Sequence, residues 1–285
     1  MKKSLKSITI KVPATSANLG PGFDSLGVAL SLYNRITVTQ TEATESFGML
    51  KEAASLFFKT AQVKAFHYGI KIVGDVPMSR GLGSSVTVRL GFLAGLNHLA
   101  GLPLNEEEIL DLVIQLEGHP DNAVPAFFGG FACASKQGWL YQPIKSSLKF
   151  VTFIPEMELE TKKARAVLPK KVSLADAVTN LQNTAIITAA FCTQNYELLQ
   201  GSFKDTLHQP YRAKLLPSLQ PMIESAEKAG ALGGFLSGAG STMIALALEE
   251  TQRVVSAMKK TANQYKVPGQ ILVLQADNTG YQVLK

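Results

Sequence analysis

The residues Arg80-Gly81-Leu82-Gly83-Ser84-Ser85 have the composition of a phosphate-binding turn. They follow a strand-like run at 68–73 and lead directly into an apolar segment with helical spacing. Two glycines permit positive φ and let N–H groups approach an anion, and a helix that begins here directs its free N–H groups to the same point. No Gly-Lys-Ser/Thr follows, and Val86 replaces the third glycine of the dinucleotide fingerprint. A plain glycine turn before a buried helix is the alternative.

A second group of reactive side chains is Glu117-Gly118-His119-Pro120-Asp121-Asn122. Carboxylate oxygens suit Mg²⁺, and a hydroxyl such as Ser85 often shares a nucleotide-bound metal with one carboxylate. Asn122 cannot accept a proton at neutral pH, so its amide would orient a hydroxyl, and phosphoryl transfer needs little help from a base. On an extended segment, adjacent side chains point apart, so we expect Asp121 to face away from that hydroxyl. The alternative is a helix end with solvated charges.

Two further loops combine glycine with small polar residues. The loop within 13–24 presents Asn18 and Asp24, an amide and a carboxylate suited to a substrate hydroxyl and ammonium, although an ordinary surface turn has a similar composition. The turn Leu236-Ser237-Gly238-Ala239-Gly240-Ser241-Thr242 separates two apolar runs, and by itself it predicts a hairpin.

The elements that must position these loops follow from periodicity and turn signals. Asn105 and Glu108 form a capping box, and the helix that they begin should stop at Gly118-His119-Pro120. In the first half we predict mixed α/β structure, and in the second half α+β structure, divided near 144–155 into domains 1–150 and 151–285. The predicted strands lie near 7–13, 26–40, 69–76, 130–135, 148–154 and 269–276, with a pair around 238–240; the predicted helices lie near 84–100, 173–192, 213–229 and 251–264.

Composition limits the class of protein. The chain has 285 residues, and its formal net charge of +6 comes from scattered basic residues without interleaved aromatics, which argues against a nucleic-acid partner. A cleft that attracts a polyphosphate explains the same excess. Cys133 and Cys192 are the two cysteines, which fits a reducing cytoplasm. Lys2, Lys3 and Lys6 do not precede an apolar core of signal-peptide length, and no apolar run is long enough to span a bilayer.

Taken together and in this order, the four motifs resemble those of the homoserine kinases within the GHMP small-molecule kinase family. The motif His208-Gln209-Pro210-Tyr211-Arg212 adds to the likeness, which spans nearly the whole chain. The resemblance implies an α+β GHMP kinase fold, with an N-terminal domain like ribosomal protein S5 domain 2 and a ferredoxin-like C-terminal domain. It also implies ATP- and Mg²⁺-dependent phosphorylation of L-homoserine to O-phospho-L-homoserine for threonine synthesis, by a cytoplasmic enzyme for which a homodimer is a candidate assembly.

The resemblance also carries residue roles to matching positions. Ser85 and Glu117 would ligate Mg²⁺, and Gly81 to Ser84 would cradle the phosphates. The residues placed around the nucleotide are Pro77, Ser79, Arg80, Gly81, Leu82, Gly83, Ser84 and Ser85. Those placed around homoserine are Asn18, Asp24, His119, Asn122, Arg165 and Arg212, with Arg212 the first candidate for the substrate carboxylate and Arg165 the second.

Three positions depart from the family pattern and bear on nucleotide affinity and substrate preference. Ser241 replaces a usual proline, Asn183 stands where some members have an arginine, and the segment before Leu50 is short, with Gly48 where an asparagine is common. The alternatives are a GHMP kinase for another small alcohol and a catalytically silent metabolite sensor. A third, an S5-like nucleic-acid binder, predicts salt-dependent retention of DNA or RNA.

Overall fold

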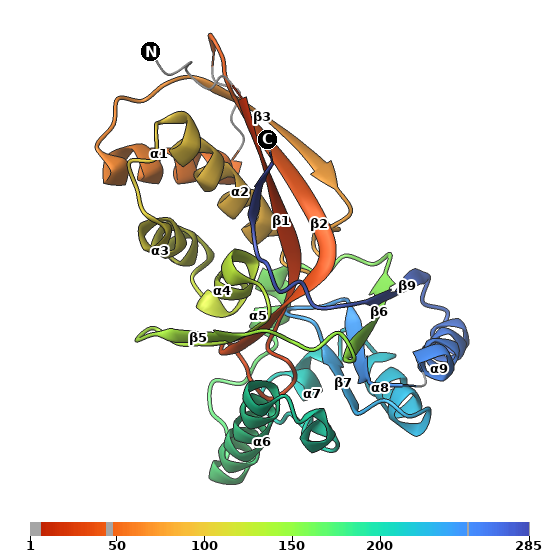
Figure 1. Cartoon of the computed structure of the whole chain (residues 1–285). Coiled ribbons are helices and arrows are strands. Elements are labelled where there is room, and N and C mark those ends of the chain that lie inside the picture. Colours follow the sequence, from red (N-terminus) through yellow and green to blue (C-terminus); the bar gives the residue numbers. More distant parts are fainter. Residues whose placement is uncertain (1–6, 44–47, 250, 285) are drawn as a thin grey trace.

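The centre of the first half is a long antiparallel ribbon of β1 (Ser7–Ala17) and β2 (Leu26–Gln40). In this computed structural model, which describes residues 7–43, 48–249 and 251–284, the ribbon belongs to a six-stranded sheet (Figure 1). The sheet has the order β10-β1-β2-β4-β5, and β3 also pairs with β2. The additional strands are β3 (Tyr68–Gly74), β4 (Phe131–Ala134), β5 (Trp139–Gln142) and β10 (Gln282–Leu284).

Four helices pack on one side of this sheet (Figure 1). They are α1 (Gly48–Ala61), α2 (Ser84–Leu99), α3 (Glu106–Glu117) and α4 (Pro120–Phe128). Helix α2 lies directly on β1 and β2, so the phosphate-type turn before it is fixed against the centre of the sheet. The capping box of Asn105 and Glu108 is present, and Gly118 ends α3 in the left-handed conformation, as predicted.

The second half contains a four-stranded antiparallel sheet in the order β7-β8-β6-β9. Its strands are β6 (Lys149–Pro155), β7 (Gly233–Leu236), β8 (Met243–Ala247) and β9 (Gly269–Leu274). Helices α8 (Leu219–Lys228) and α9 (Thr251–Gln264) pack on it. With β6, α8, β7, β8, α9 and β9 in chain order, this is the predicted ferredoxin-like arrangement, and residues 156–218 form an insertion between β6 and α8.

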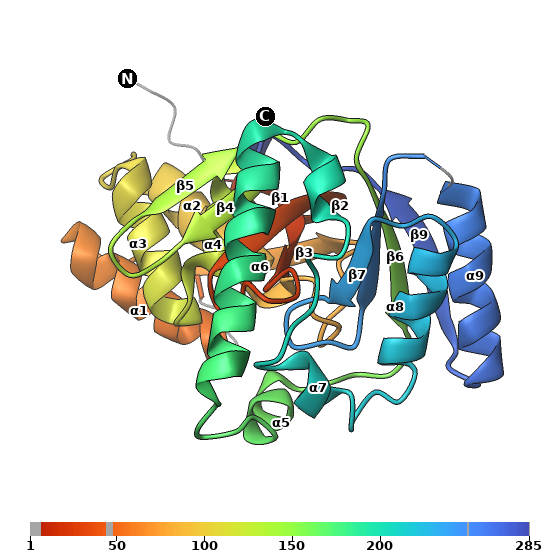
Figure 2. The ribbon, with the colours of Figure 1, turned by 90° about the horizontal axis from the view of Figure 1, so that it is seen from below.

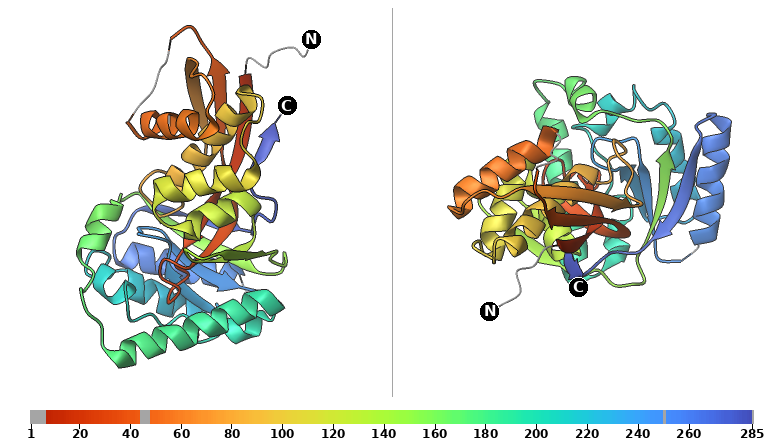
Figure 3. Two further views of the ribbon diagram at one scale, coloured as in Figure 1. Left: turned by 90° about the vertical axis from the view of Figure 1, so that its left-hand side faces the viewer. Right: turned by 90° about the horizontal axis from the view of Figure 1, so that it is seen from above.

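Alternate side chains of β6 enter two different cores. Phe150 and Ile154 join a core shared by both sheets, whereas Val151 and Phe153 pack with α8 and α9. The long helix α6 (Leu174–Thr193) lies across the lower side of the molecule (Figures 2 and 3) and closes the shared core. The ring of Phe191 from α6 stacks on Phe131 of β4, with centroids 4.4 Å apart. The insertion also contains α5 (Thr161–Ala166), a 3₁₀ turn at Tyr196–Leu199 and α7 (Gln209–Arg212).

Most of the predicted elements are confirmed within a few residues. Helix α8 begins at Leu219 and not at 213, because Pro217 interrupts the predicted helix. The sequence interpretation did not include α1, α4, α5, α7, β5 or β10. Strand β10 returns the chain to the first sheet, and the division at residue 150 stays a prediction.

Some predictions fall outside the described part of the chain or concern membranes. Lys2, Lys3 and Lys6 lie outside it, as do residues 44–47 of the short segment before Leu50. Among the helices of the described ranges, none has the length and apolar character needed to cross a membrane.

Candidate active site

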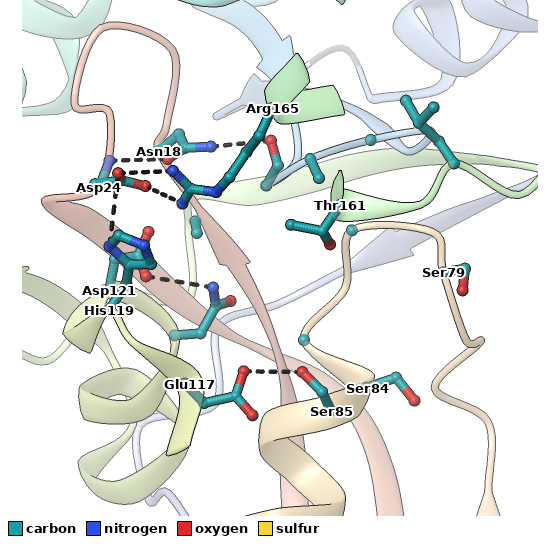
Figure 4. Close-up of a pocket in the computed structure, with 18 of the residues that line it drawn as sticks. Asn18, Asp24, Ser79, Ser84, Ser85, Glu117, His119, Asp121, Thr161 and Arg165 are labelled. Carbon is teal, nitrogen blue, oxygen red and sulfur yellow. Dashed lines mark hydrogen bonds and ion pairs between the residues drawn. The ribbon is translucent and has the colours of Figure 1, made fainter. Parts of the chain in front are cut away.

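The four motif loops meet at one pocket of about 240 Å³ between the two halves of the molecule (Figure 4). Helices α2, α3 and α4 beside two of the loops pack in the core of the first half, whereas β7 and β8 beside the last loop pack in the other two cores, so the packing of both sheets is required to bring the loops together. The predicted residues that line the pocket are Asn18, Asp24, Pro77, Ser79, Gly81, Gly83, Ser84, Ser85, Glu117, His119, Asn122, Arg165 and Arg212. Lining residues that were not predicted include Asp121, Leu159 and Thr161.

The phosphate-type turn requires its glycines. Gly83 caps α2 with φ +68°, and a Cβ there would lie 2.0 Å from Oγ1 of Thr15. Gly81 has φ +76°, and a Cβ there would lie 2.1 Å from the carbonyl oxygen of Ser237. The first turn of α2 leaves its N–H groups without partners inside the helix, beside the pocket. The turn therefore has the geometry expected of an anion cradle.

Arg80 and Leu82 do not place their side chains in the pocket. Leu82 is fully buried in the shared core and thereby anchors the turn. The Arg80 guanidinium donates hydrogen bonds to the carbonyls of Met78 and Pro155 and pairs with Glu158 at 2.8 Å. The side chains of these two residues thus hold the turn in place, and their contact with nucleotide stays a prediction that only the backbone of the turn could fulfil.

The predicted metal pair is assembled. Oγ of Ser85, in the first turn of α2, donates to Oε2 of Glu117 at 2.9 Å (Figure 4). The other oxygen of Glu117, Oε1, lies 2.7 Å from Nη1 of Arg89, a residue that the sequence interpretation did not consider. A hydroxyl and a carboxylate are the oxygen donors that Mg²⁺ prefers, and phosphate oxygens and water would complete its shell.

Asp24 is the centre of a charged cluster on the opposite side of the pocket (Figure 4). Arg165 makes two contacts with its carboxylate, at 2.9 and 3.3 Å, and Nδ1 of His119 lies 3.5 Å from Oδ2. Oδ1 of Asn18 accepts a hydrogen bond from the backbone N–H of Asp24 at 3.0 Å, and Nδ2 of Asn18 donates to the carbonyl of Gly238 at 2.9 Å. Asn18 thus holds the loop of Asp24 against the last glycine turn.

Arg212 is buried at the floor of the pocket, with only 1% of its surface exposed. Nη1 donates to the carbonyl of Gly238 at 2.9 Å and meets Nδ1 of His208 at 3.1 Å, and Nε donates to the carbonyl of Ala164. In the described structure Nη2 has no hydrogen-bond partner. Burial, together with the neighbouring Arg165, lowers the pKa of Arg212 to about 10, so the group stays cationic at neutral pH. A buried guanidinium with a free nitrogen suits a carboxylate ligand.

Asp121 and Asn122 lie on a helix and not on an extended segment. Pro120 is the first residue of α4, so both side chains fall in its first turn and both line the pocket. The extended segment on which the two side chains would point apart is therefore wrong, and the expectation that Asp121 faces away from the substrate hydroxyl stays a prediction. Oδ1 of Asn122 accepts from Oγ1 of Thr15 at 2.7 Å. Nδ2 of Asn122 lies 3.4 Å from Oδ1 of Asp121.

Asp121 is only 3% exposed. Burial first, and then the nearby charges of Asp24 and Glu117, raise its pKa to about 7, against the opposing effects of the Asn122 backbone and Arg165. The alternative of solvated charges for this motif is therefore wrong, because Asp121 is buried and Glu117 is paired. A proline at a first helical position followed by an acidic residue was the signal for α4.

The last glycine turn joins β7 and β8, as a hairpin would, and it also contacts the other loops. Oγ of Ser237 lies 2.6 Å from the carbonyl of Gly81, and the backbone N–H of Gly238 donates to Ala17. Two of the residues that depart from the family pattern, Ser241 and Asn183, lie outside the pocket lining. Ser241 donates to the carbonyl of Met157, and Asn183 donates to the carbonyl of Lys204.

Comparison with known proteins identifies the family. Residues 48–130 match the model of the GHMP kinases N terminal domain, and residues 187–264 match that of the GHMP kinases C terminal domain. The homoserine kinase of Clostridium beijerinckii is 40% identical over 294 residues, covering 98% of this chain and 99% of the relative. That of Caldicellulosiruptor saccharolyticus is 38% identical over 97% of this chain and 96% of the relative.

A solved structure shows the same fold. The crystal structure of homoserine kinase from Cytophaga hutchinsonii superposes with a TM-score of 0.90 at 24% identity, covering 100% of this chain and 99% of that one. The α+β GHMP kinase fold predicted from the sequence is thereby confirmed. Since its relatives match it from end to end at up to 40% identity, the chain belongs to the homoserine kinases of the GHMP kinase family.

Proposed function

We propose that the protein transfers the γ-phosphoryl group of ATP to the side-chain hydroxyl of L-homoserine, giving O-phospho-L-homoserine and ADP in threonine biosynthesis. The observation that carries this proposal is the pocket itself. One cavity of about 240 Å³ joins a glycine turn at a helix N-terminus to a separate cluster of two arginines and two carboxylates. The first end suits a polyphosphate and the second suits a small amino acid with both of its charged groups.

The substrate groups follow the charges of the cluster. Arg212, with its free Nη2, and Arg165 take the carboxylate of homoserine. Asp24 and Asp121 take its ammonium, which also compensates the mutual repulsion of the two carboxylates. Arg165 already pairs with Asp24, so the substrate joins an existing network of opposite charges.

The nucleotide lies at the other end of the pocket in this proposal. The N–H groups of residues 81–85 bind the phosphates, with Pro77 and Ser79 at the rim. Ser85 and Glu117 hold Mg²⁺, which neutralises charge on the phosphoryl group when it is bound. Thus the hydroxyl acceptor and the phosphoryl donor are held in one orientation.

Asn122 lies between the two ends and orients the hydroxyl of homoserine. Its carbonyl oxygen accepts from Thr15, which fixes the direction of the amide. An amide does not take the proton, and a loose phosphoryl-transfer transition state depends mainly on positioning and charge neutralisation. In this mechanism Asp121 binds the ammonium and no side chain acts as an obligatory base.

The proposal is tested by ADP release with ATP and Mg²⁺ against homoserine, mevalonate, galactose and shikimate, with the phosphorylated product identified by phosphorus NMR. We expect turnover with homoserine alone. Turnover with another alcohol would favour a different GHMP kinase activity. If no alcohol is phosphorylated but ATP and homoserine bind in calorimetry, the metabolite-sensor alternative replaces the kinase.

A further inference from the structure

Arg89 and Ser85 occupy the same face of α2, one helical turn apart, and both reach the carboxylate of Glu117. Nη1 of Arg89 lies 2.7 Å from Oε1, while Oγ of Ser85 donates to Oε2 at 2.9 Å. The side chains of Arg89 and Glu117 are 16% and 13% exposed. Arg89 does not line the pocket, so it acts on the site only through Glu117.

The ion pair with Glu117 holds the guanidinium of Arg89 in position. Nε of Arg89 is buried, and within the described ranges it has no hydrogen-bond partner. Among the described residues, no group of three or more His, Cys, Asp or Glu side chains is arranged to hold a metal ion. The predicted cation site is therefore a hydroxyl and one carboxylate, whose charge the half-buried Arg89 already balances.

We propose that Arg89 is a positioning residue that makes divalent-cation binding at Ser85 and Glu117 depend on bound nucleotide. This inference rests on the proposed function. Without nucleotide, an incoming cation meets a carboxylate neutralised by Arg89 and is repelled by the guanidinium. With nucleotide, the negative phosphates outweigh that repulsion and supply the missing oxygen ligands. Oε1 stays paired with Arg89, and Oε2 stays on the side of Ser85.

The test measures Mn²⁺ binding by electron paramagnetic resonance, with and without a non-hydrolysable ATP analogue. We expect Arg89→Met to bind Mn²⁺ about tenfold more tightly than the wild type when nucleotide is absent, since one unit charge beside a divalent ion is worth about this much even in water. Arg89→Lys keeps the charge and should behave like the wild type. Arg89→Gln is a second neutral variant, and circular dichroism verifies that each variant is folded.

Two controls locate the effect. Arg35→Met removes an exposed arginine of β2 and should leave Mn²⁺ binding unchanged. Adding Glu117→Gln to Arg89→Met should abolish the tighter binding. Equal or weaker Mn²⁺ binding by both neutral variants, without nucleotide, overturns the inference. If those variants still phosphorylate homoserine, the proposed function stands although the inference about Arg89 fails. Failure of the inference and failure of the proposed function are therefore distinguished by separate measurements.

Discussion

Asp121 gives the most quantitative test of the site, because burial raises the pKa of its carboxyl from 3.8 to about 7. The folded protein holds this proton more tightly than the unfolded chain does. The energetic cost of ionising Asp121 is therefore absent below pH 3.8, grows between the two values, and is complete above about pH 7. A shift of roughly three units corresponds to about 4 kcal/mol of lost stability at pH 8, and to less than half of that at pH 5.

Replacement by asparagine removes this cost. Asp121→Asn should raise the free energy of unfolding by about 4 kcal/mol at pH 8, with a gain that shrinks at pH 5. Urea unfolding at both pH values measures it. Asp111→Asn, on the exposed side of α3, is the matched control and should change stability by less than about 0.5 kcal/mol at either pH. An equal effect of Asp121→Asn at both pH values would refute the assignment of a raised pKa.

The same group should set the pH dependence of substrate binding. Only ionised Asp121 attracts the ammonium of homoserine, and its ionised fraction rises about tenfold between pH 6 and pH 8 for a pKa of about 7. The KM for homoserine should therefore fall by up to about tenfold over this interval in the wild type, and this contribution should be missing in Asp121→Asn. A collapse of kcat in a folded Asp121→Asn variant that still binds ATP would instead identify Asp121 as the base.

Four other substitutions separate the parts of the pocket. Glu117→Ala should lower kcat by about two to three orders of magnitude through loss of the metal ligand, and normal kinetics would exclude that role. Arg212→Leu should raise the KM for homoserine while the KM for ATP stays nearly constant; an equal rise in both would indicate a structural role. Asn122→Leu should reduce kcat about a hundredfold by misplacing the hydroxyl. Thr15→Val removes only the hydrogen bond that supports the Asn122 amide, so it should reduce kcat by less. A larger loss of kcat in Thr15→Val than in Asn122→Leu would contradict the proposed orientation.

The loops were readable from sequence because each needs special backbone chemistry. Gly81 and Gly83 adopt positive φ where a Cβ would strike another loop, and such positions select glycine strongly. Helix α1 was also readable in principle: Leu50, Ala53, Ala54 and Phe57 are its buried residues and follow helical spacing. In contrast, α4 is short and contains Pro125, so its prolines suggested an end to helical structure. The structure has the first turn of a helix there, and that turn presents Asp121.

The remaining contacts of the site depend on tertiary packing. Nothing in the local pattern around Arg89 distinguishes a surface arginine from one that pairs with Glu117, since the two lie on different helices. The same holds for Arg80, whose distant partners Pro155 and Glu158 come from the end of β6 and the segment after it. Sequence reasoning identified the reactive residue types. The packing of α2 on α3, and the contact of the turn before α2 with the end of β6, decided which of them face the pocket.

Strand β10 has a consequence for how the chain assembles. It pairs with β1, and Lys11 and Gln282, bonded across this pair, are 271 residues apart in sequence. Ahead of it, Asp277 bonds Tyr33 and the backbone of Ala29 and Gly130. During synthesis the first sheet therefore has an open edge at β1 until the second half of the chain has been made. Such an open edge is a site for misdirected strand pairing. A fragment ending near residue 150 would keep that edge permanently, because the strand that covers β1 comes from the end of the chain.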